Sequence, residues 1–275
     1  MRIRVAVAVV VVLTVGMAAR PAQAQYRPKS TSDRATGETY HVEIAGDFWN
    51  PTPDIMIRSD ALGIKSDLID FVNDLGIEKT KFHQIKVVLR PSTKSKFRFE
   101  YTPITYEADT TIHRELIFNG IRYTLALPVH TELEWKAYRF GYEYDFLYKD
   151  RGFFGVLFDL KYTDVNAQLV NVINTEFAEA KAPIPAIGAI GRVYVAPNIS
   201  ITGEFSGFPN GIVSRIDENS DGHYFDLDIY GTVNFTDHAG AQVGYRSFNV
   251  FYKVNGEDQG DLKLNGLYFG GVVRF

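Results

Sequence analysis

Hydrophobic and polar residues alternate with a period of two along most of the chain beyond residue 38. Residues 131–148 show the pattern most clearly, because one face carries Tyr138, Phe140, Tyr142, Tyr144, Phe146 and Tyr148. The opposite face carries Arg139, Gly141, Glu143 and Asp145. A period of two is typical of β-strands. A row of aromatic side chains is expected where a strand meets lipid, so the pattern predicts strands with a lipid-facing side.

The same alternation predicts about ten strands, at 39–50, 82–90, 96–106, 131–148, 152–163, 184–196, 199–208, 223–236, 239–252 and 265–275. Long connections at 51–81, 107–130, 164–183 and 209–222 alternate with short turns at 91–95, 149–151, 197–198 and 237–238. Long extracellular loops and short periplasmic turns are typical of outer-membrane barrels. We therefore predict an all-β fold, in which residues 39–275 form a transmembrane antiparallel up-and-down β-barrel. Eight and twelve strands are the alternative counts.

The last predicted strand places Leu267, Phe269, Gly271, Val273 and Phe275 on one face. This segment resembles the C-terminal strand of bacterial outer-membrane β-barrels, and the chain is similar to the small barrels of the OmpA and OmpW type. The resemblance implies a place in the outer membrane of a Gram-negative-type bacterium, surrounded by outer-membrane lipid. It also implies that Phe269, Val273 and Phe275 act as an insertion signal for the barrel-assembly machinery.

The first residues predict export. Arg2 and Arg4 precede an apolar run at 5–15, and Ala22-Gln23-Ala24 is typical of a cleavage site, so we expect residues 1–24 to be a cleaved signal peptide. Residues 25–38 are polar and are expected to form a disordered periplasmic lead-in. The chain has no cysteine and thus neither disulfides nor thiol chemistry. Loss of Arg2, Arg4 and Arg20 takes the formal net charge from −4 to −7, which argues against nucleic acid as a partner.

Two connections contain local structure of their own. In residues 66–76 the apolar residues Leu68, Phe71, Val72 and Leu75 have helical spacing, with Ser66 as a possible cap and Gly76 as the end. We expect a short helix over the barrel mouth; a plug or lid inside the lumen is the alternative. Asn119-Gly120 lies between two apolar segments, 112–118 and 121–127, and predicts a type I′ hairpin that extends the barrel wall.

The face opposite the apolar one carries charges of both signs. A barrel of about ten strands is narrow enough for side chains to fill it, and buried charges require partners. We therefore predict ion-pair networks that plug the lumen, with a narrow pore or a lateral opening for a hydrophobic molecule as alternatives. The predicted network consists of Glu43, Lys86, Arg90, Arg98, Glu100, Arg139, Glu143, Asp159, Lys161, Arg192, Glu204, Asp226, Asp228 and Arg246. His41, Asp47, Asp145 and Arg274 are also expected to face inward.

Candidate chemistry is sparse, and no cofactor is expected except a possible calcium ion. Asp217, Asn219 and Asp221 match the opening of a calcium-binding loop. Asp228 would be the twelfth ligand, but about 20 Å of extended chain separates it from the others, so an Asx-rich loop tip is the alternative. His113, His130 and His223 lie in or next to the predicted loops, but no spacing selects a catalytic set.

Three functions are consistent with the sequence. The first is a structural or surface-interaction barrel whose loops do the work. The second is a narrow channel or a transporter of small or hydrophobic solutes. The third is an outer-leaflet lipid-modifying enzyme, which would require one of the loop histidines. We expect the first function. The outward aromatic side chains argue against a soluble periplasmic barrel.

Overall fold

The computed structural model of the protein describes residues 35–60, 64–170, 175–208, 220–254 and 258–275. The expected signal peptide and most of the lead-in lie outside these residues. The described strands are β1 (Val42–Arg58), β2 (Ile69–Asp70), β3 (Phe82–Leu89), β4 (Ser95–Thr111), β5 (Leu116–Phe118), β6 (Ile121–Tyr123), β7 (Pro128–Lys149), β8 (Gly152–Val170), β9 (Thr175–Ala196), β10 (Ile199–Phe208), β11 (Ser220–Asn234), β12 (Ala239–Val254) and β13 (Asp258–Arg274).

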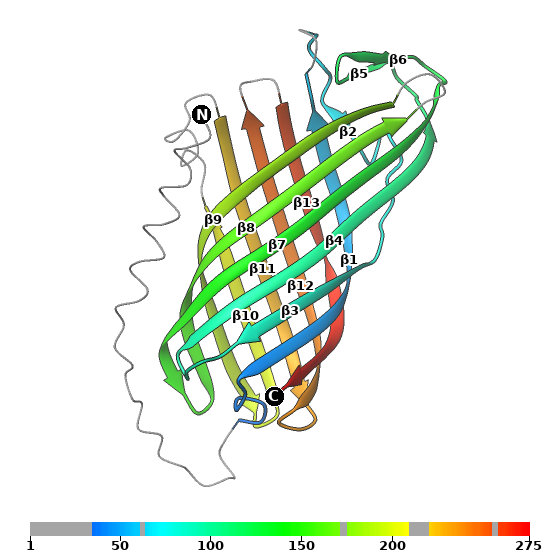
Figure 1. Cartoon of the computed structure of the whole chain (residues 1–275). Coiled ribbons are helices and arrows are strands. Elements are labelled where there is room, and N and C mark those ends of the chain that lie inside the picture. Colours follow the sequence, from blue (N-terminus) through cyan, green and yellow to red (C-terminus); the bar gives the residue numbers. More distant parts are fainter. Residues whose placement is uncertain (1–34, 61–63, 171–174, 209–219, 255–257) are drawn as a thin grey trace. The chain divides into compact units, whose positions relative to one another are not determined.

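Ten of these strands form a closed antiparallel barrel, which confirms the predicted fold class. The strands β1, β3, β4 and β7 to β13 pair in that order, and β1 closes the sheet on β13 through a register that runs from Glu43↔Arg274 to Arg58↔Gln259. Strand β2 pairs with β1, and β5 and β6 form a separate hairpin (Figure 1). Within the described residues no helix is long and apolar enough to cross a membrane.

The two ends of the barrel differ. The short turns at 90–94, 150–151, 197–198 and 235–238 lie at one end together with Phe275, and we call this the turn end. The β5–β6 hairpin and the connection that contains β2 lie at the other end, which we call the loop end (Figure 1). The connections at 59–81 and 112–127 are long, as predicted, whereas the predicted long connection at 164–183 shortens to residues 171–174 between β8 and β9.

The polar and apolar faces of the strands exchange between the turn end and the loop end. In β7, Phe140 and Tyr144 point outward and Arg139 points into the lumen, as predicted. Nearer the loop end the same strand buries Trp135 inside and presents Glu134 outside. Strands β1 and β13 change in the same way, with Ile55, Ile57, Leu262 and Leu264 buried and Asp54, Asp261 and Lys263 on the outer side. The outer surface therefore consists of an apolar belt around the turn half and a polar surface around the loop half.

This inversion explains why the predicted loops were too long. Residues 51–58 continue β1, residues 107–111 and 128–130 belong to β4 and β7, and residues 164–170 and 175–183 form the adjoining parts of β8 and β9. Residues 220–222 likewise belong to β11. Outside lipid a barrel wall has polar residues on its outer face, so these segments resembled loops in the sequence.

Local irregularities correct three predicted orientations. A β-bulge between Asp145 and Leu147 shifts the register of β7 against β8, so Tyr148 stacks on Phe153 inside the turn end and does not continue the outward aromatic row. Strand β1 begins at Val42, later than predicted. Before that point, Tyr40 is buried and His41 is exposed, the reverse of the expected alternation.

The predicted helix at 66–76 is wrong. Ile69 and Asp70 pair with β1, and a turn follows, in which the Asp70 side chain accepts hydrogen bonds from the amides of Val72 and Asn73. An aspartate that caps a turn competes with helix formation. The Asn119-Gly120 turn forms as predicted, with positive φ at both residues (48° and 78°). Among the described strands, β5 and β6 form a two-stranded sheet of their own and do not extend the wall.

Residues 35–38, assigned from the sequence to the disordered lead-in, are ordered at the turn end. The Thr36 amide donates to the Pro197 carbonyl at 2.8 Å, and the Gly37 amide donates to the Asp237 carboxylate at 2.9 Å. The Asn234 side chain donates to the Thr36 carbonyl. This segment therefore connects two turns, and it carries Glu38 into the lumen.

Candidate functional site

The turn half of the lumen is filled by charged side chains, which we call the ionic layer. Every residue of the predicted network lies in it, and all are buried except Lys86 and Arg98, whose side chains are about one-tenth exposed. The complete layer consists of Glu38, Glu43, Asp47, Lys86, Arg90, Lys96, Arg98, Glu100, Arg139, Glu143, Asp145, Asp159, Lys161, Arg192, Glu204, Asp226, Asp228, Arg246 and Arg274.

Several ion pairs join strands that are not neighbours in the sheet and therefore cross the lumen. Arg246 of β12 binds Asp226 with two hydrogen bonds, of 2.8 and 3.0 Å, and also contacts Glu100 of β4. Lys86 of β3 contacts Asp228 of β11 at 2.7 Å. Paired guanidinium and carboxylate groups in this geometry are strong and directional. The ionic layer thus ties opposite walls of the barrel together.

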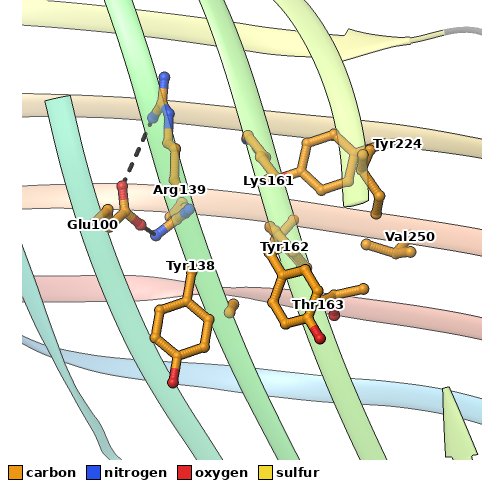
Figure 2. A pocket seen from close by; sticks show the side chains of 12 residues that line it. Glu100, Tyr138, Arg139, Lys161, Tyr162, Thr163, Tyr224 and Val250 are labelled. Carbon is orange, nitrogen blue, oxygen red and sulfur yellow. Dashed lines mark hydrogen bonds and ion pairs between the residues drawn. The ribbon is translucent and has the colours of Figure 1, made fainter. Parts of the chain in front are cut away.

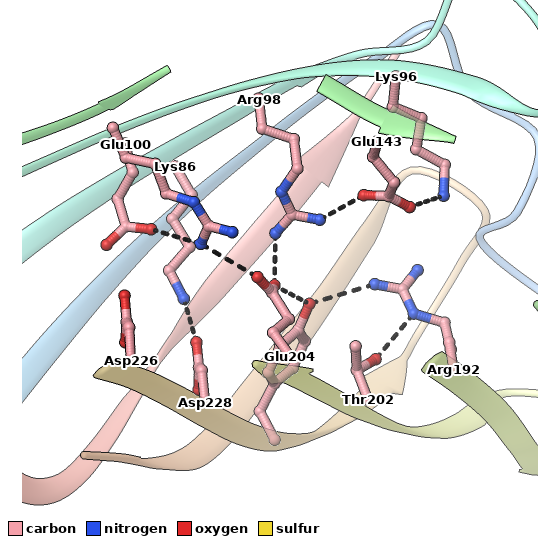
Figure 3. A network of polar contacts seen from close by, with 12 residues as sticks. Lys86, Lys96, Arg98, Glu100, Glu143, Arg192, Thr202, Glu204, Asp226 and Asp228 are labelled. Carbon is pink, nitrogen blue, oxygen red and sulfur yellow. Dashed lines mark hydrogen bonds and ion pairs between the residues drawn. The ribbon is translucent and has the colours of Figure 1, made fainter. Parts of the chain in front are cut away.

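A second branch of the layer centres on Arg98 of β4. One guanidinium nitrogen donates to Glu143 of β7 at 2.6 Å and another donates to Glu204 of β10 (Figure 3). Glu143 also accepts from Lys96 at 2.5 Å, and Glu204 accepts from Arg139 at 3.1 Å. Each charge of this branch has at least one partner of opposite sign, which offsets the free-energy cost of removing it from water.

Glu38 and Lys96 belong to the ionic layer but were missed in the sequence. Glu38 accepts from Arg192 at 2.9 Å and from Tyr194 at 2.8 Å, and Arg90 contacts its second carboxylate oxygen at 3.4 Å. Glu38 precedes the first strand, so no alternation indicated its position. Lys96 shares the parity of Arg98 and Glu100 on β4, and extending that alternation by one step would have found it.

The loop half of the lumen is filled by a continuous apolar cluster, which we call the apolar layer. Barrel strands contribute Trp49, Ile55, Ile57, Phe82, Ile104, Tyr106, Val129, Leu133, Trp135, Val165, Ala167, Leu169, Ile184, Ala186, Tyr224, Tyr230, Phe248, Val250, Leu262, Leu264 and Tyr268. The connections contribute Ile69, Phe71, Leu75, Ile77, Ile112, Leu116, Phe118 and Tyr123. The segment predicted as a helix therefore contributes Ile69, Phe71, Leu75 and Ile77 to this buried cluster.

A small cavity lies where the two layers meet. Its polar wall includes Glu100, Arg139 and Lys161, and its apolar wall includes Ile184 and Val250 (Figure 2). Its volume is about 20 Å³, which is room for about one water molecule. The Lys161 ammonium beside it is bound by the Asp226 carboxylate at 2.7 Å and by the Tyr224 hydroxyl at 2.5 Å. This space is too small for a solute.

A larger groove opens at the loop end. It has a volume of about 720 Å³ and is lined by Asp109, Thr110, Thr111, His113, Pro128, Val129, His130 and Val170. His130 and Asp109 are cross-strand neighbours, and their Nδ1 and Oδ1 atoms are 2.8 Å apart. Two of the histidines singled out in the sequence thus share one groove. His223 lies elsewhere, stacked on Phe251.

The ion pair between Asp74 and Arg114 joins residues 66–77 to the connection that contains the β5–β6 hairpin. The Arg114 Nε atom donates to Asp74 at 2.8 Å, and a second guanidinium nitrogen also contacts this carboxylate. The Asp67 amide and carboxylate bond to the backbone of Ile117. Partial burial acts to raise the pKa of Asp74, but the hydrogen bonds from Arg114 and from the Asp70 amide outweigh it and lower that pKa.

The calcium candidate is only partly described, whereas the predicted insertion signal is fully described. Asp217 and Asn219 of the calcium candidate lie outside the described residues, and the Asp221 carboxylate accepts the Gly222 amide at 2.8 Å. No group of three or more metal-ligating side chains occurs in the part of the chain that the structure describes. Phe269, Val273 and Phe275 of the C-terminal strand all point outward into the apolar belt.

The architecture is that of bacterial outer-membrane β-barrels. It resembles the outer membrane protease OmpT of Escherichia coli, with a TM-score of 0.61, 9% sequence identity and coverage of 90% of this chain and 99% of that one. Weaker likenesses, both at a TM-score of 0.37, are to the attachment invasion locus protein Ail of Yersinia pestis (10% identity, 86% and 99% coverage) and to the toluene transporter TodX of P. putida (7% identity, 91% and 95% coverage). No family model and no curated protein matches the sequence. At these identities the likeness shows the fold alone.

Proposed function

We propose that this protein is an integral outer-membrane barrel with a closed lumen, whose loop end serves as a rigid surface for interactions outside the cell. The observation that carries the proposal is the apolar layer, which fills the loop half of the interior with Trp49, Trp135 and their neighbours. The ionic layer closes the turn half with ion pairs that cross the lumen. A filled interior is also what small OmpA-type barrels have, which supports the kinship expected from the sequence.

The proposed orientation places the turn end in the periplasm and the loop end outside the cell. Short turns face the periplasm in outer-membrane barrels, and the apolar belt around the turn half matches a bilayer at that level. The polar outer surface around the loop half would then stand above the lipid. Export by a cleaved signal peptide and insertion through the C-terminal strand belong to the same proposal.

Ion conductance of the refolded protein in a planar bilayer tests the closed lumen. The gel mobility of boiled and unboiled samples serves as the folding control. We expect a folded barrel without discrete current steps, because two chemically different layers would have to open together. Discrete, ion-selective steps would contradict the proposal and favour the narrow-channel alternative.

The His130–Asp109 pair favours a second candidate, an outer-leaflet lipid-modifying enzyme. A carboxylate bound to Nδ1 orients an imidazole so that Nε2 can act as a general base, and the pair lines an open groove. The test is release of fatty acid from lipopolysaccharide and phospholipid vesicles by the wild type and by H130Q. An activity lost in H130Q and kept in H41Q, a variant of an exposed turn-end histidine, would support this candidate. No release by the wild type would reject it for these lipids.

A further inference from the structure

Asp47 is a buried carboxylate without a partner. It lies on β1 with its side chain in the lumen, opposite Gln84 of β3 and Gly270 of β13. It is 2% exposed, and neither of its carboxylate oxygens has a hydrogen-bond partner among the described residues. The next residue, Phe48, points outward into the apolar belt, so Asp47 lies at the level of the membrane. An unpaired ionisable group at this depth indicates a functional site.

Asp47 differs from the other carboxylates of the ionic layer in having no cationic partner among the described residues. Every other carboxylate of the layer lies within ion-pair distance of a lysine or arginine of the layer; these are Glu38, Glu43, Glu100, Glu143, Asp145, Asp159, Glu204, Asp226 and Asp228. Among the described residues, the layer has one carboxylate more than it has lysine and arginine side chains. The one carboxylate in excess of the lysine and arginine side chains therefore matches Asp47, the one carboxylate of the layer without a cationic partner among the described residues.

The cations that face Asp47 are engaged elsewhere. Lys86 and Arg246 attract the Asp47 carboxylate, and Asp228 and Glu100 repel it. Lys86 is bound to Asp228 at 2.7 Å, and Arg246 is bound to Asp226 and Gln84. The phenol of Tyr268, on β13, donates to Asp228. The Gln84 Nε2 atom, opposite Asp47, also has no partner among the described atoms.

We propose that Asp47 binds one small, exchangeable positive counterion in the lumen, either a proton or a metal cation. A carboxylate in a medium of low polarity is strongly destabilised unless its charge is neutralised. Since no cluster of three metal-ligating side chains exists in the described part of the chain, a metal ion would be held by Asp47 together with backbone or amide oxygens and water. The lumen would then be a closed compartment whose stability responds to one ion.

The test compares the full-length refolded barrel with D47N in lipid vesicles. Unfolding in guanidinium is followed by tryptophan fluorescence, since Trp49 is the next inward residue of β1 and is buried. The control is D54N, because Asp54 lies on the same strand and is exposed. Titrations of pH, at fixed salt, and of sodium, potassium and calcium chloride, at fixed pH, distinguish the two ions.

If the counterion is a proton, the folded-to-unfolded ratio of the wild type and D54N falls by up to about tenfold per unit rise in pH, relative to D47N. The infrared carbonyl band of a protonated carboxylic acid is then present in the wild type and absent from D47N. If the counterion is a metal cation, the folded-to-unfolded ratio rises by up to about tenfold for each tenfold increase in the concentration of that cation. This rise is expected only in the proteins that retain Asp47.

A second variant, D228N, tests the proposal even if D47N does not fold. In D228N the Lys86 ammonium is free to pair with Asp47, so we expect the dependence on the counterion to disappear although Asp47 is intact. Equal pH and salt dependence in the wild type and D47N, without a carbonyl difference, would overturn the proposal. If D47N does not fold, an unchanged dependence in D228N would overturn it.

Discussion

Several charges in the lumen are each held by more than one partner. Glu204 accepts from Arg98 and from Arg139, and Arg98 also contacts Glu143. A buried charge that loses its partner keeps the desolvation cost without the attraction. Single neutral substitutions should therefore be more damaging here than on any outward face of the barrel.

Glu204→Gln tests this expectation. It leaves two guanidinium groups facing an uncharged amide, so we expect a loss of about 3–5 kcal/mol in the free energy of unfolding. Glu134→Gln, on the outward face of β7, should change it by less than about 0.5 kcal/mol. Guanidinium unfolding in vesicles measures both, and equal midpoints for the two variants would contradict the assigned role of Glu204.

The Asp74–Arg114 pair should make the loop end sensitive to acid. The pKa of Asp74 is lowered in the folded state, so its stabilising contribution is present above the unfolded pKa of about 3.9 and is lost as pH falls through the lowered value. The contribution is small, at most about 1 kcal/mol, because Arg114 is largely exposed. The protection of residues 66–77 against hydrogen exchange, taken relative to the intrinsic exchange rate at each pH, should fall below that pH in the wild type. R114Q should show faster exchange already at neutral pH, and identical exchange in both proteins would contradict the assignment.

At the scale of a strand, one element serves two environments. The part of β7 near the turn end faces lipid outside and charge inside, whereas the part near the loop end faces water outside and the apolar layer inside. The alternation is continuous, and only the chemistry of the two faces is exchanged. The wall above the membrane therefore resembles a soluble β-sandwich in its energetics.

Trp135→Ala and Phe140→Ala, both on β7, separate these environments. Trp135 is 1% exposed and packs against Phe248 with the two rings tilted, so its removal leaves a cavity and should cost about 3–5 kcal/mol. Phe140 is 51% exposed within the apolar belt, where lipid chains can fill the space it leaves, so its removal should cost clearly less. Thermal unfolding monitored by gel mobility compares the two. A larger effect of Phe140→Ala would contradict the two-environment description.

For the whole molecule, the orientation in the membrane can be tested without background labelling, because the chain has no cysteine. Leu125 is exposed in the connection at the loop end, and Thr236 is exposed in a turn at the opposite end. We expect a membrane-impermeant maleimide to label L125C on intact cells and T236C only after the outer membrane is permeabilised. Labelling of T236C alone on intact cells would reverse the proposed orientation.

The sequence by itself determined the barrel, because lipid on one side and a narrow lumen on the other impose a period of two that any strand must display. It also identified most of the ionic layer, from Glu43 to Arg246, because those residues share the parity of the alternation. It could not place Glu38, which no strand periodicity reaches, or reveal that Asp145 begins a bulge that turns Tyr148 inward.

Only the tertiary structure decided where each strand leaves the lipid and what fills the loop half. The segments of β4 and β7 that carry outward glutamates resembled loops in the sequence, whereas in the closed barrel Trp135, Ile55, Leu264 and Phe71 belong to one buried cluster. Alternation states that two faces differ, but it does not state which face is inside. That choice depends on the medium outside each part of the wall, which the fold sets and a local pattern does not contain.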